Sequence, residues 1–131
     1  MKLYTFPKAP NPMRVDLMLK YKGISVDSES VDLRNGEQMG EAYRKINPRC
    51  TAPALLLDDG TLLTEVIAIC KYLDSQHPDK SVFGSNDAEQ ALVIDWMHRT
   101  FTEGFMAVAE VLRNSSPGMK DRALPGPHNF V

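Results

Sequence analysis

The sequence predicts a small α/β domain followed by an all-helical segment. Three observations favour this fold class: an opening with strand, helix and strand character, a hairpin signal around Asp59-Gly60, and helical periodicity after residue 86. The composition agrees, because 43% hydrophobic and 24% charged residues are typical of a globular protein. A chain of 131 residues fits one compact domain, or one small domain and part of another.

The opening segment predicts a β-α-β unit. Residues 2–6 are rich in β-branched and aromatic side chains and end at a proline, which favours a strand. Residues 12–22 place apolar side chains at helical spacing, and Gly23 ends that run. Residues 25–31 weakly suggest a second strand. Two strands joined by a helix are typical of a parallel pair with a crossover connection.

The next segment predicts a short helix and then a hairpin. The helix is expected at residues 41–46, after a polar stretch. Residues 54–57 and 61–63 are apolar runs on either side of Asp59-Gly60, and this dipeptide between two such runs is a strong hairpin signal.

A further helix is expected at residues 65–76. Thr64 is the expected N-cap, and His77-Pro78 is expected to end the helix. The predicted element order is therefore βαβ-α-ββ-α within residues 1–77.

Residues 78–86 are expected to form a linker, and residues 87–131 to begin an all-helical second domain that is incomplete here. Asn86 and Glu89 have the spacing of a capping box at a helix start. The apolar residues after them recur at steps of three and four: Ile94, Met97, Phe101, Phe105, Val108 and Leu112. This pattern predicts a helix of about 28 residues, about 42 Å long at the usual rise.

Charge and cysteine content exclude several classes of protein. The formal net charge of −2, from 15 basic and 17 acidic residues, leaves no electrostatic footprint for nucleic acid or for an anionic membrane. No apolar run approaches the roughly 20 residues of a membrane span, and the N-terminus has no signal-peptide pattern, so a cytoplasmic location is expected. Cys50 and Cys70 lack zinc-site or disulfide-scaffold spacing, so we expect no metal.

The stretch from Ile46 to Leu73 carries several short motifs in a fixed order: Asn47-Pro48, Pro53-Ala54-Leu55, Asp59-Gly60, Thr64-Glu65, Ala68-Ile69 and Tyr72-Leu73. In this combination the stretch resembles the glutathione transferases, whose first domain has a thioredoxin-like fold. The resemblance covers residues 1–78 and continues into the first long helix. It implies a thioredoxin-like glutathione-binding domain at residues 1–77, the start of the family's all-α C-terminal domain at residues 87–131, and a homodimer.

The resemblance also implies how glutathione would bind. Pro53 would be the family's cis-proline, leaving the Ala52 backbone free to pair with the peptide like a short added strand; the alternative is a proline that starts an edge strand. Glu65 would receive the γ-glutamyl ammonium group, and the Val66 N–H the γ-glutamyl carboxylate. The alternative for Glu65 is an acidic residue that only complements the helix dipole beside Thr64.

Two further positions fall where relatives bind the glycyl end of glutathione. Gln38 stands where relatives use His or Gln, and the alternative is a solvated loop residue. Thr51 stands where many relatives have Lys, which should weaken charge pairing with the ligand.

At the γ-glutamyl end, Val66 replaces a Ser that is common in relatives. The contact from the Ser hydroxyl is therefore lost, and the backbone N–H of Val66 remains.

The candidate catalytic residue is Asn11. Ala9 replaces the Ser or Cys of other transferases, and the Ala-Pro-Asn-Pro segment contains no redox-active thiol. An Asn in this setting resembles nu-class transferases, which implies that its amide approaches the glutathione sulfur. Lowering the pKa of the glutathione thiol by one unit needs about 1.36 kcal/mol of preference for the thiolate. A hydrogen bond to a charged group supplies about 1.5–3 kcal/mol, which is enough to bring this pKa toward neutrality. The alternative is that Asn11 only caps a helix that begins at Pro12.

These residues together imply a glutathione transferase with glutathione as co-substrate. The thiolate would attack a small hydrophobic electrophile, a peroxide or a disulfide, and the nu-class resemblance implies disulfide reductase or peroxidase activity. Trp96, His98, Arg99 and Phe105 line a co-substrate pocket or belong to the core. The alternative function is a non-catalytic transferase-like module that binds glutathione or a protein.

Overall fold

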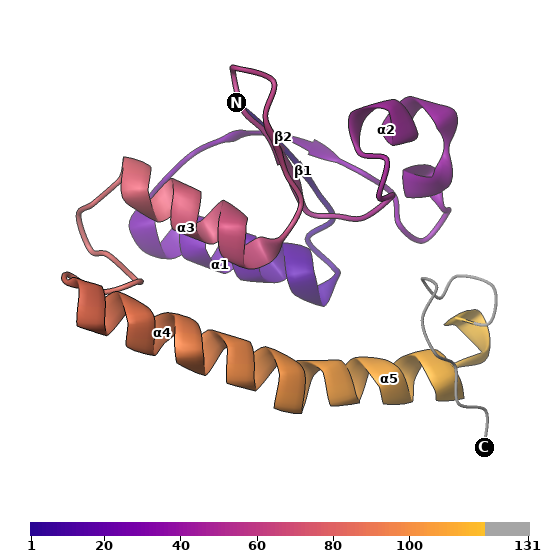
Figure 1. Cartoon of the computed structure of the whole chain (residues 1–131). Helices are drawn as coiled ribbons and strands as arrows, with labels where there is room; N and C mark the ends of the chain where they lie inside the picture. The colour runs from indigo at the N-terminus through magenta and orange to yellow at the C-terminus, as the bar shows by residue number, and fades with distance from the viewer. Residues whose placement is uncertain (120–131) are drawn as a thin grey trace. The chain divides into compact units, whose positions relative to one another are not determined.

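The structure is a computed structural model, and it describes residues 1–119 (Figure 1). The chain divides into two compact units, Met1–Val82 and Phe83–Val131. Each unit is described by itself.

A four-stranded mixed sheet forms the centre of the first unit. Its strands are β1 (Lys2–Thr5), β2 (Asp27–Ser30), β3 (Ala54–Leu56) and β4 (Leu62–Leu63), in the spatial order β2-β1-β3-β4. β1 and β2 are parallel, and β1 pairs with β3, and β3 with β4, in antiparallel register. The predicted β-α-β opening and the predicted hairpin are therefore both confirmed.

Three α-helices belong to the first unit: α1 (Pro10–Lys22), α2 (Glu41–Ile46) and α3 (Val66–Gln76), with a short 3-10 helix at Glu37–Met39 before α2. Figure 1 shows α1 and α3 side by side, with α2 at a distance from both. Helix α1 ends at Gly23, whose φ of 68° is left-handed and whose N–H bonds back to the last turn of the helix.

The two faces of the sheet carry separate parts of the core. Tyr4 and Ala54 point to one face and pack with Val31 and with Tyr43 of α2, where the rings of Tyr4 and Tyr43 meet edge to face at 5.9 Å. Leu3 and Leu55 alternate with Tyr4 and Ala54 along their strands, so they point to the other face. The buried residues that accompany this second face on α1 and α3 are Val15, Met18, Ile69 and Leu73.

The carboxyl ends of α1 and α3 are tied together by a buried ion pair. Lys22 Nζ lies 2.6 Å from Asp74 Oδ1, and the two side chains are only 1% and 4% exposed. Asp74 also accepts hydrogen bonds from the Ser81 hydroxyl at 2.7 Å and from the Val82 N–H at 3.1 Å. Burial by itself would raise the pKa of the Asp74 carboxyl, but the hydrogen bonds that it accepts outweigh burial and hold this pKa below its ordinary value.

The alternative that Asn11 caps α1 and the prediction that Thr64 caps α3 are both wrong. Helix α1 begins two residues earlier than expected, with Ala9 at the N-cap, so Asn11 lies inside the first turn and does not cap the helix. Prolines are tolerated throughout a first turn because its N–H groups have no intrahelical acceptor, so Pro10 starts the helix as readily as Pro12. In α3 the N-cap position is taken by Glu65 and not by Thr64, and no side chain caps that helix.

The second unit consists of a long helix with a change of geometry in the middle. It runs through α4 (Asp87–Arg99), a π-helical segment (Thr100–Phe105) and α5 (Met106–Ser115), followed by a 3-10 turn at Pro117–Met119. The predicted cap is confirmed, since Asn86 Oδ1 accepts from the Glu89 N–H at 3.0 Å. The predicted extent of the helix is also confirmed.

The prediction of a uniform helix is wrong at the π-helical segment. The Thr102 hydroxyl donates to the carbonyls of His98 and Arg99, which competes with the regular helical hydrogen bonds. The rings of Phe101 and Phe105 stack with their centroids 5.5 Å apart. Apolar spacing alone does not reveal such local competition. The predicted tail includes residues 120–131, which lie outside the described residues.

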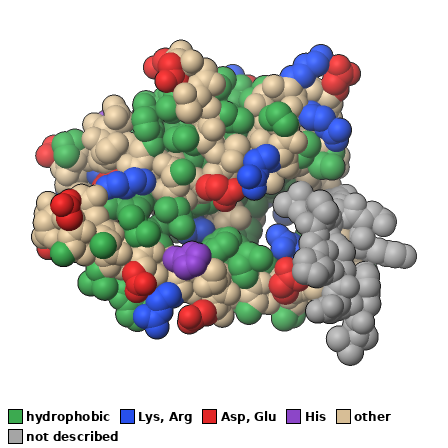
Figure 2. Space-filling model, in the orientation of Figure 1, with side chains coloured by type: hydrophobic (Ala, Val, Ile, Leu, Met, Phe, Trp, Pro, Cys, Tyr) green, Lys and Arg blue, Asp and Glu red, His purple; other side chains and the backbone are tan. Residues whose placement is uncertain are grey.

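Figure 2 shows acidic and basic side chains interspersed over the visible face, without a large area of one sign. Within residues 1–119, no helix combines the length and the apolar character that crossing a membrane requires.

Candidate functional site

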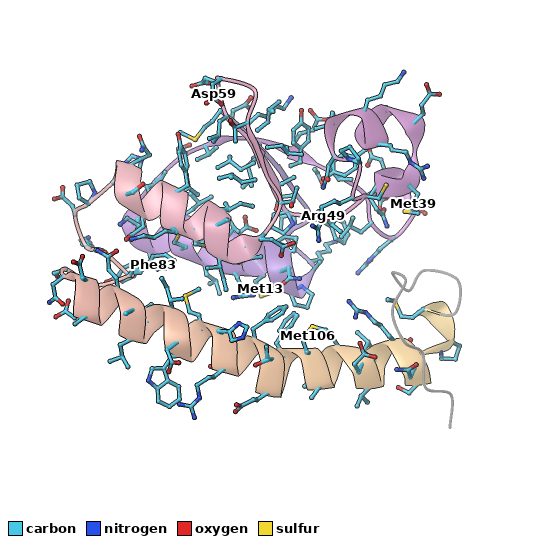
Figure 3. All side chains as sticks on the ribbon, in the orientation of Figure 1. Met13, Met39, Arg49, Asp59, Phe83 and Met106 are labelled. Atoms are coloured by element: carbon cyan, nitrogen blue, oxygen red, sulfur yellow. The ribbon has the colours of Figure 1, made fainter. Side chains whose placement is uncertain are left out.

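The residues that the sequence singles out in the first unit lie at the ends of its helices and in the loop before β3. They are Asn11 in the first turn of α1, Gln38 in the 3-10 helix, Thr51, Ala52 and Pro53 before β3, and Glu65 and Val66 at the start of α3. Figure 3 shows Arg49, from the same loop, between the start of α3 and the segment that carries Met39.

The loop before β3 is hydrogen-bonded to Tyr43 of α2 and to Asn47, the residue that follows α2. The Thr51 carbonyl accepts two hydrogen bonds, from the Tyr43 hydroxyl at 2.6 Å and from Asn47 Nδ2 at 2.7 Å. Asn47 is completely buried, and its Oδ1 accepts from the Arg49 N–H at 3.0 Å. Burial raises the pKa of the Tyr43 hydroxyl, so this group stays protonated and continues to donate well above neutral pH.

This anchoring sets the direction of the Ala52 N–H. The Thr51–Ala52 peptide bond is trans, and in a trans peptide the C=O and the N–H point in opposite directions. Because the Thr51 carbonyl points toward Tyr43 and Asn47, the Ala52 N–H points away from them. No partner for the Ala52 N–H or C=O occurs within residues 1–119. The loop therefore presents one unpaired backbone donor and one unpaired backbone acceptor.

The peptide bond between Ala52 and Pro53 is cis, which is the geometry that the resemblance implies. Pro53 is fully buried, whereas Ala52 is half-buried. The Thr51 side chain also faces the interior of the loop, since its hydroxyl oxygen lies 3.3 Å from Asn47 Nδ2.

The start of α3 offers unpaired backbone donors. The first helical hydrogen bond runs from the Ile69 N–H to the Glu65 carbonyl at 3.0 Å, so the N–H groups before Ile69, beginning with that of Val66, have no intrahelical acceptor. With no side-chain cap on this helix, these donors and the helix dipole favour an anion.

The Glu65 carboxylate has a basic partner. Arg49 Nη2 lies 3.1 Å from Glu65 Oε1, and the two side chains are 65% and 66% exposed. Sequence reasoning did not single out Arg49, because its partner is distant in the chain. The signal that was available is its place directly after Asn47-Pro48, in the loop that carries the expected ligand-binding residues.

The Asn11 amide is oriented by Arg14. Arg14 Nη1 donates to Asn11 Oδ1 at 3.4 Å. A guanidinium group has donors and no acceptor, so it fixes the amide with its oxygen toward Arg14 and its nitrogen on the other side. Asn11 is half-buried, and among the described residues no acceptor is bonded to its Nδ2. Arg14, which the sequence did not reveal, therefore lies beside this candidate residue and contacts its side chain.

Gln38 is half-buried, and its Oε1 is buried without a hydrogen-bond partner among the described residues. A buried, unpaired carbonyl oxygen differs from the solvated loop side chain that is the alternative for this position. An unpaired buried polar atom is unfavourable in isolation, and a ligand would supply a partner.

Neither cysteine supplies a thiol at the first turn of α1. Cys70 is buried in α3, and burial raises the pKa of its thiol to about 11, which keeps it protonated at neutral pH. Cys50 is half-buried, with its Sγ 3.7 Å from the Pro48 carbonyl oxygen. Across residues 1–119, no three His, Cys, Asp or Glu side chains form a group that could hold a metal ion.

Comparison with known proteins identifies the family. A family model described as glutathione S-transferase, N-terminal domain, matches residues 9–76. Glutathione S-transferase GstA of Escherichia coli O157:H7 is 34% identical over 119 residues, covering 89% of this chain and 59% of GstA.

Solved structures agree. The crystal structure of a glutathione S-transferase domain-containing protein from Marinobacter aquaeolei VT8 has a TM-score of 0.84 at 33% identity, covering 91% of this chain and 59% of that protein. A glutathione transferase homologue from Sulfitobacter, solved with bound glutathione, has a TM-score of 0.76 at 26% identity, covering 87% of this chain and 54% of that protein.

The chain thus spans between half and two thirds of the length of these proteins. Together with the observed strand order, the comparisons confirm the thioredoxin-like fold.

Proposed function

The chain belongs to the glutathione S-transferase family, and from this premise we propose that its first unit binds glutathione and favours the thiolate form of the bound peptide. The observation that carries this proposal is the unpaired Ala52 N–H and C=O, held away from Tyr43 and Asn47 by the anchored Thr51 carbonyl. A peptide backbone is the natural partner for such a donor and acceptor, in the manner of strand addition.

The remaining groups match the two ends of glutathione. Glu65 receives the γ-glutamyl ammonium, and the unpaired Val66 N–H donates to the γ-glutamyl carboxylate. Gln38 and the Thr51 hydroxyl serve the glycyl end. The unpaired Gln38 Oε1 accepts from the glycyl N–H of the peptide, and Gln38 Nε2 donates to the glycyl carboxylate, which itself has no donor. The Thr51 hydroxyl accepts from Asn47 Nδ2 and keeps its own O–H as a donor. Pro53 shapes the loop beneath the cysteinyl residue.

The thiolate is favoured by Asn11. With its oxygen turned to Arg14, the amide donates from Nδ2 to the glutathione sulfur, close to the positive end of the α1 dipole. A hydrogen bond to a charged group contributes about 1.5–3 kcal/mol, which lowers a thiol pKa by about one to two units.

The resulting thiolate attacks a small hydrophobic electrophile, a peroxide or a disulfide. With an electrophile, a sulfur–carbon bond forms and the leaving group departs with its electron pair. With a disulfide, a sulfur–sulfur bond of a mixed disulfide forms and the other sulfur leaves as a thiolate. With a peroxide, a sulfur–oxygen bond forms as the O–O bond breaks; glutathione becomes a sulfenic acid, and the distal oxygen leaves as an alkoxide or hydroxide that takes up a proton. The protein works as a detoxifying homodimer in the cytoplasm. The exposed apolar side chains of α4 and α5 agree with a partner surface: Leu92, Ile94, Trp96, Val108, Val111 and Leu112.

Calorimetric titration with reduced and with oxidised glutathione tests the binding. We expect a Kd between micromolar and millimolar, about −8 to −4 kcal/mol, for the reduced form. Tighter binding of the oxidised form would favour the disulfide reaction. Failure of both forms to bind would overturn the proposal. Binding together with no turnover of an electrophile, a peroxide or a disulfide would instead favour the non-catalytic module.

The role of Asn11 is tested by Asn11→Ala and by the near-isosteric Asn11→Asp, which replaces the donor by an acceptor. Both variants should bind glutathione with a thiol of higher pKa and turn over more slowly at neutral pH. Asn11→Asp should show the larger loss, because its carboxylate repels the thiolate. Unchanged turnover in both variants would remove Asn11 from the mechanism and leave the binding proposal standing.

A further inference from the structure

We propose that Arg49 determines specificity for the γ-glutamyl end of glutathione, and that the Arg49–Glu65 ion pair opens to receive a zwitterionic α-amino acid group. In the bound state Glu65 pairs with the ligand ammonium and Arg49 pairs with the ligand carboxylate. This inference rests on the proposed function, because it places the γ-glutamyl group beside Glu65.

The geometry of the pair leaves capacity for a ligand. Arg49 and Glu65 share one contact, from Nη2 to Oε1 at 3.1 Å. A guanidinium group carries five N–H donors, and a carboxylate has two acceptor oxygens. Within residues 1–119 no other hydrogen bond or ion pair involves either side chain, so most of the donors of Arg49 and the second oxygen of Glu65 are available to a ligand.

The exposure of the pair makes it easy to open. Both side chains are about two-thirds exposed, at 65% and 66%, so water screens the attraction and solvates each group when the pair separates. Exposed ion pairs of this kind contribute little to stability. Exchanging the internal partner for a ligand therefore meets little resistance.

The charge pattern matches one class of ligand group. An α-amino acid carries its ammonium and its carboxylate on the same carbon, so it presents two opposite charges side by side. Arg49 and Glu65 present the complementary two charges side by side at the start of α3. Arg49 thus brings a cation to the γ-glutamyl end, where Val66 supplies only its backbone N–H, and a guanidinium group suits a carboxylate because it can donate two parallel hydrogen bonds.

The pairing predicts discrimination between ligands. A ligand that keeps the carboxylate and lacks the ammonium leaves Glu65 close to a like charge. A ligand that keeps the ammonium and lacks the carboxylate leaves Arg49 with Glu65 alone, so it gains nothing from Arg49. Only the complete zwitterion satisfies both side chains.

The test is calorimetric titration, at low ionic strength, of the full chain and of Arg49→Ala, Arg49→Lys and the control Lys45→Ala. Lys45 is a suitable control because it also forms an exposed ion pair, with Glu41 at 2.8 Å, on a neighbouring segment. The three ligands are glutathione, 4-aminobutyryl-cysteinyl-glycine, which lacks the γ-glutamyl carboxylate, and glutaryl-cysteinyl-glycine, which lacks the ammonium.

We expect Arg49→Ala to weaken glutathione binding about ten-fold and to leave binding of the 4-aminobutyryl ligand unchanged. Arg49→Lys should recover part of the loss, and Lys45→Ala should bind all three ligands like the unmodified chain. The unmodified chain should prefer glutathione over both truncated ligands.

Two results would overturn the inference while leaving the proposed function intact: unchanged glutathione affinity in Arg49→Ala, or an equal loss for glutathione and the 4-aminobutyryl ligand, which would mean that Arg49 acts through the loop. Absence of glutathione binding by the unmodified chain would instead overturn the proposed function, and this inference with it. A thermal unfolding scan of each variant separates these results from a loss of folding.

Discussion

The two ends of α3 each carry an acidic residue paired with a basic residue. The two pairs differ in their exposure to solvent and in the number of hydrogen bonds that the carboxylate accepts. At the carboxyl end, Asp74 is almost completely buried with Lys22 and accepts two further hydrogen bonds. At the amino end, Glu65 has a single contact with Arg49 and is two-thirds exposed. The same kind of ion pair is thus buried and fully hydrogen-bonded at the carboxyl end of the helix, and solvent-exposed with spare hydrogen-bonding groups at the amino end.

Helix α1 shows the same contrast. Lys22 near its carboxyl end is paired with the buried Asp74, whereas the amide nitrogen of Asn11 in its first turn has no hydrogen-bond partner among the described residues. The comparison teaches that desolvation decides what an ion pair does. A buried pair needs every donor and acceptor satisfied and so fixes the structure. An exposed pair with spare hydrogen-bonding capacity can exchange its partner for a ligand.

The largest effect is expected from Asp74→Asn. This change removes the negative charge and leaves the Lys22 ammonium buried without its counter-ion, so the free energy of unfolding should fall by about 3–5 kcal/mol. Urea unfolding followed by circular dichroism measures the change. The matched control is Glu41→Gln, which disrupts an exposed ion pair on α2 and should change stability by less than about 1 kcal/mol. An equally small change in Asp74→Asn would show that the buried Lys22–Asp74 pair does not stabilise the fold more than an exposed pair does.

The second prediction concerns acid. The pKa of folded Asp74 lies below its ordinary value of 3.8, so the ionised carboxylate contributes stability that is present above this value. That contribution is lost as the pH falls through the folded pKa. The unmodified chain should therefore lose stability below about pH 4, and Asp74→Asn should lose less over the same range. Parallel curves of unfolding free energy against pH would show that Asp74 is not linked to acid unfolding.

The third prediction concerns Asn11, in the first turn of α1. Asn11→Ala should raise the pKa of the bound glutathione thiol by about one to two units, which corresponds to the loss of a hydrogen bond worth about 1.5–3 kcal/mol. Absorbance of the thiolate near 240 nm, titrated against pH, measures this value. A bound thiol with the same pKa in both proteins would show that the amide does not contact the sulfur.

A smaller effect is expected from Arg14→Ala, which removes the group that turns the Asn11 amide. The thiol pKa should rise by less than in Asn11→Ala, because a freely rotating amide can still donate part of the time. In the Asn11→Ala background, Arg14→Ala should have no further effect, and the double-mutant cycle tests this. An additive shift in the double variant would mean that Arg14 acts on the sulfur by its own charge.

The smallest effect on stability is expected from Arg49→Ala. Since the Arg49–Glu65 pair is exposed, its removal should change the free energy of unfolding by about 0–1 kcal/mol. The measurement is the same urea unfolding curve as for Asp74→Asn. A loss as large as that of Asp74→Asn would erase the distinction between the two ends of α3.

Local patterns predicted most of the fold. The sequence places the short helix at Glu41–Ile46, the end of α1 at Gly23 and the turn at Asp59-Gly60, because each depends on neighbouring residues. The two helix starts were harder to predict. Several prolines near residue 10 permit more than one first residue, and both Thr64 and Glu65 can occupy a cap position.

The contacts that define the site depend on distant residues, so local patterns could not predict them. Arg49 and Glu65 come from different elements, as do Lys22 and Asp74. The family resemblance pointed to Ala52 and Glu65. The hydrogen bond from Tyr43 to the Thr51 carbonyl could not be predicted in this way, because it depends on how α2 packs against the loop before β3.

The double anchoring of the Thr51 carbonyl has a thermodynamic consequence. Ordering the backbone of a residue costs about 1–2 kcal/mol in conformational entropy, and here that cost is met when the domain folds. A peptide that docks on Ala52 therefore meets an edge that is already rigid. Tyr43→Phe would leave the core filled and remove one of the two hydrogen bonds to this carbonyl, so the edge would be less rigid and peptide binding would show a more unfavourable entropy in calorimetry.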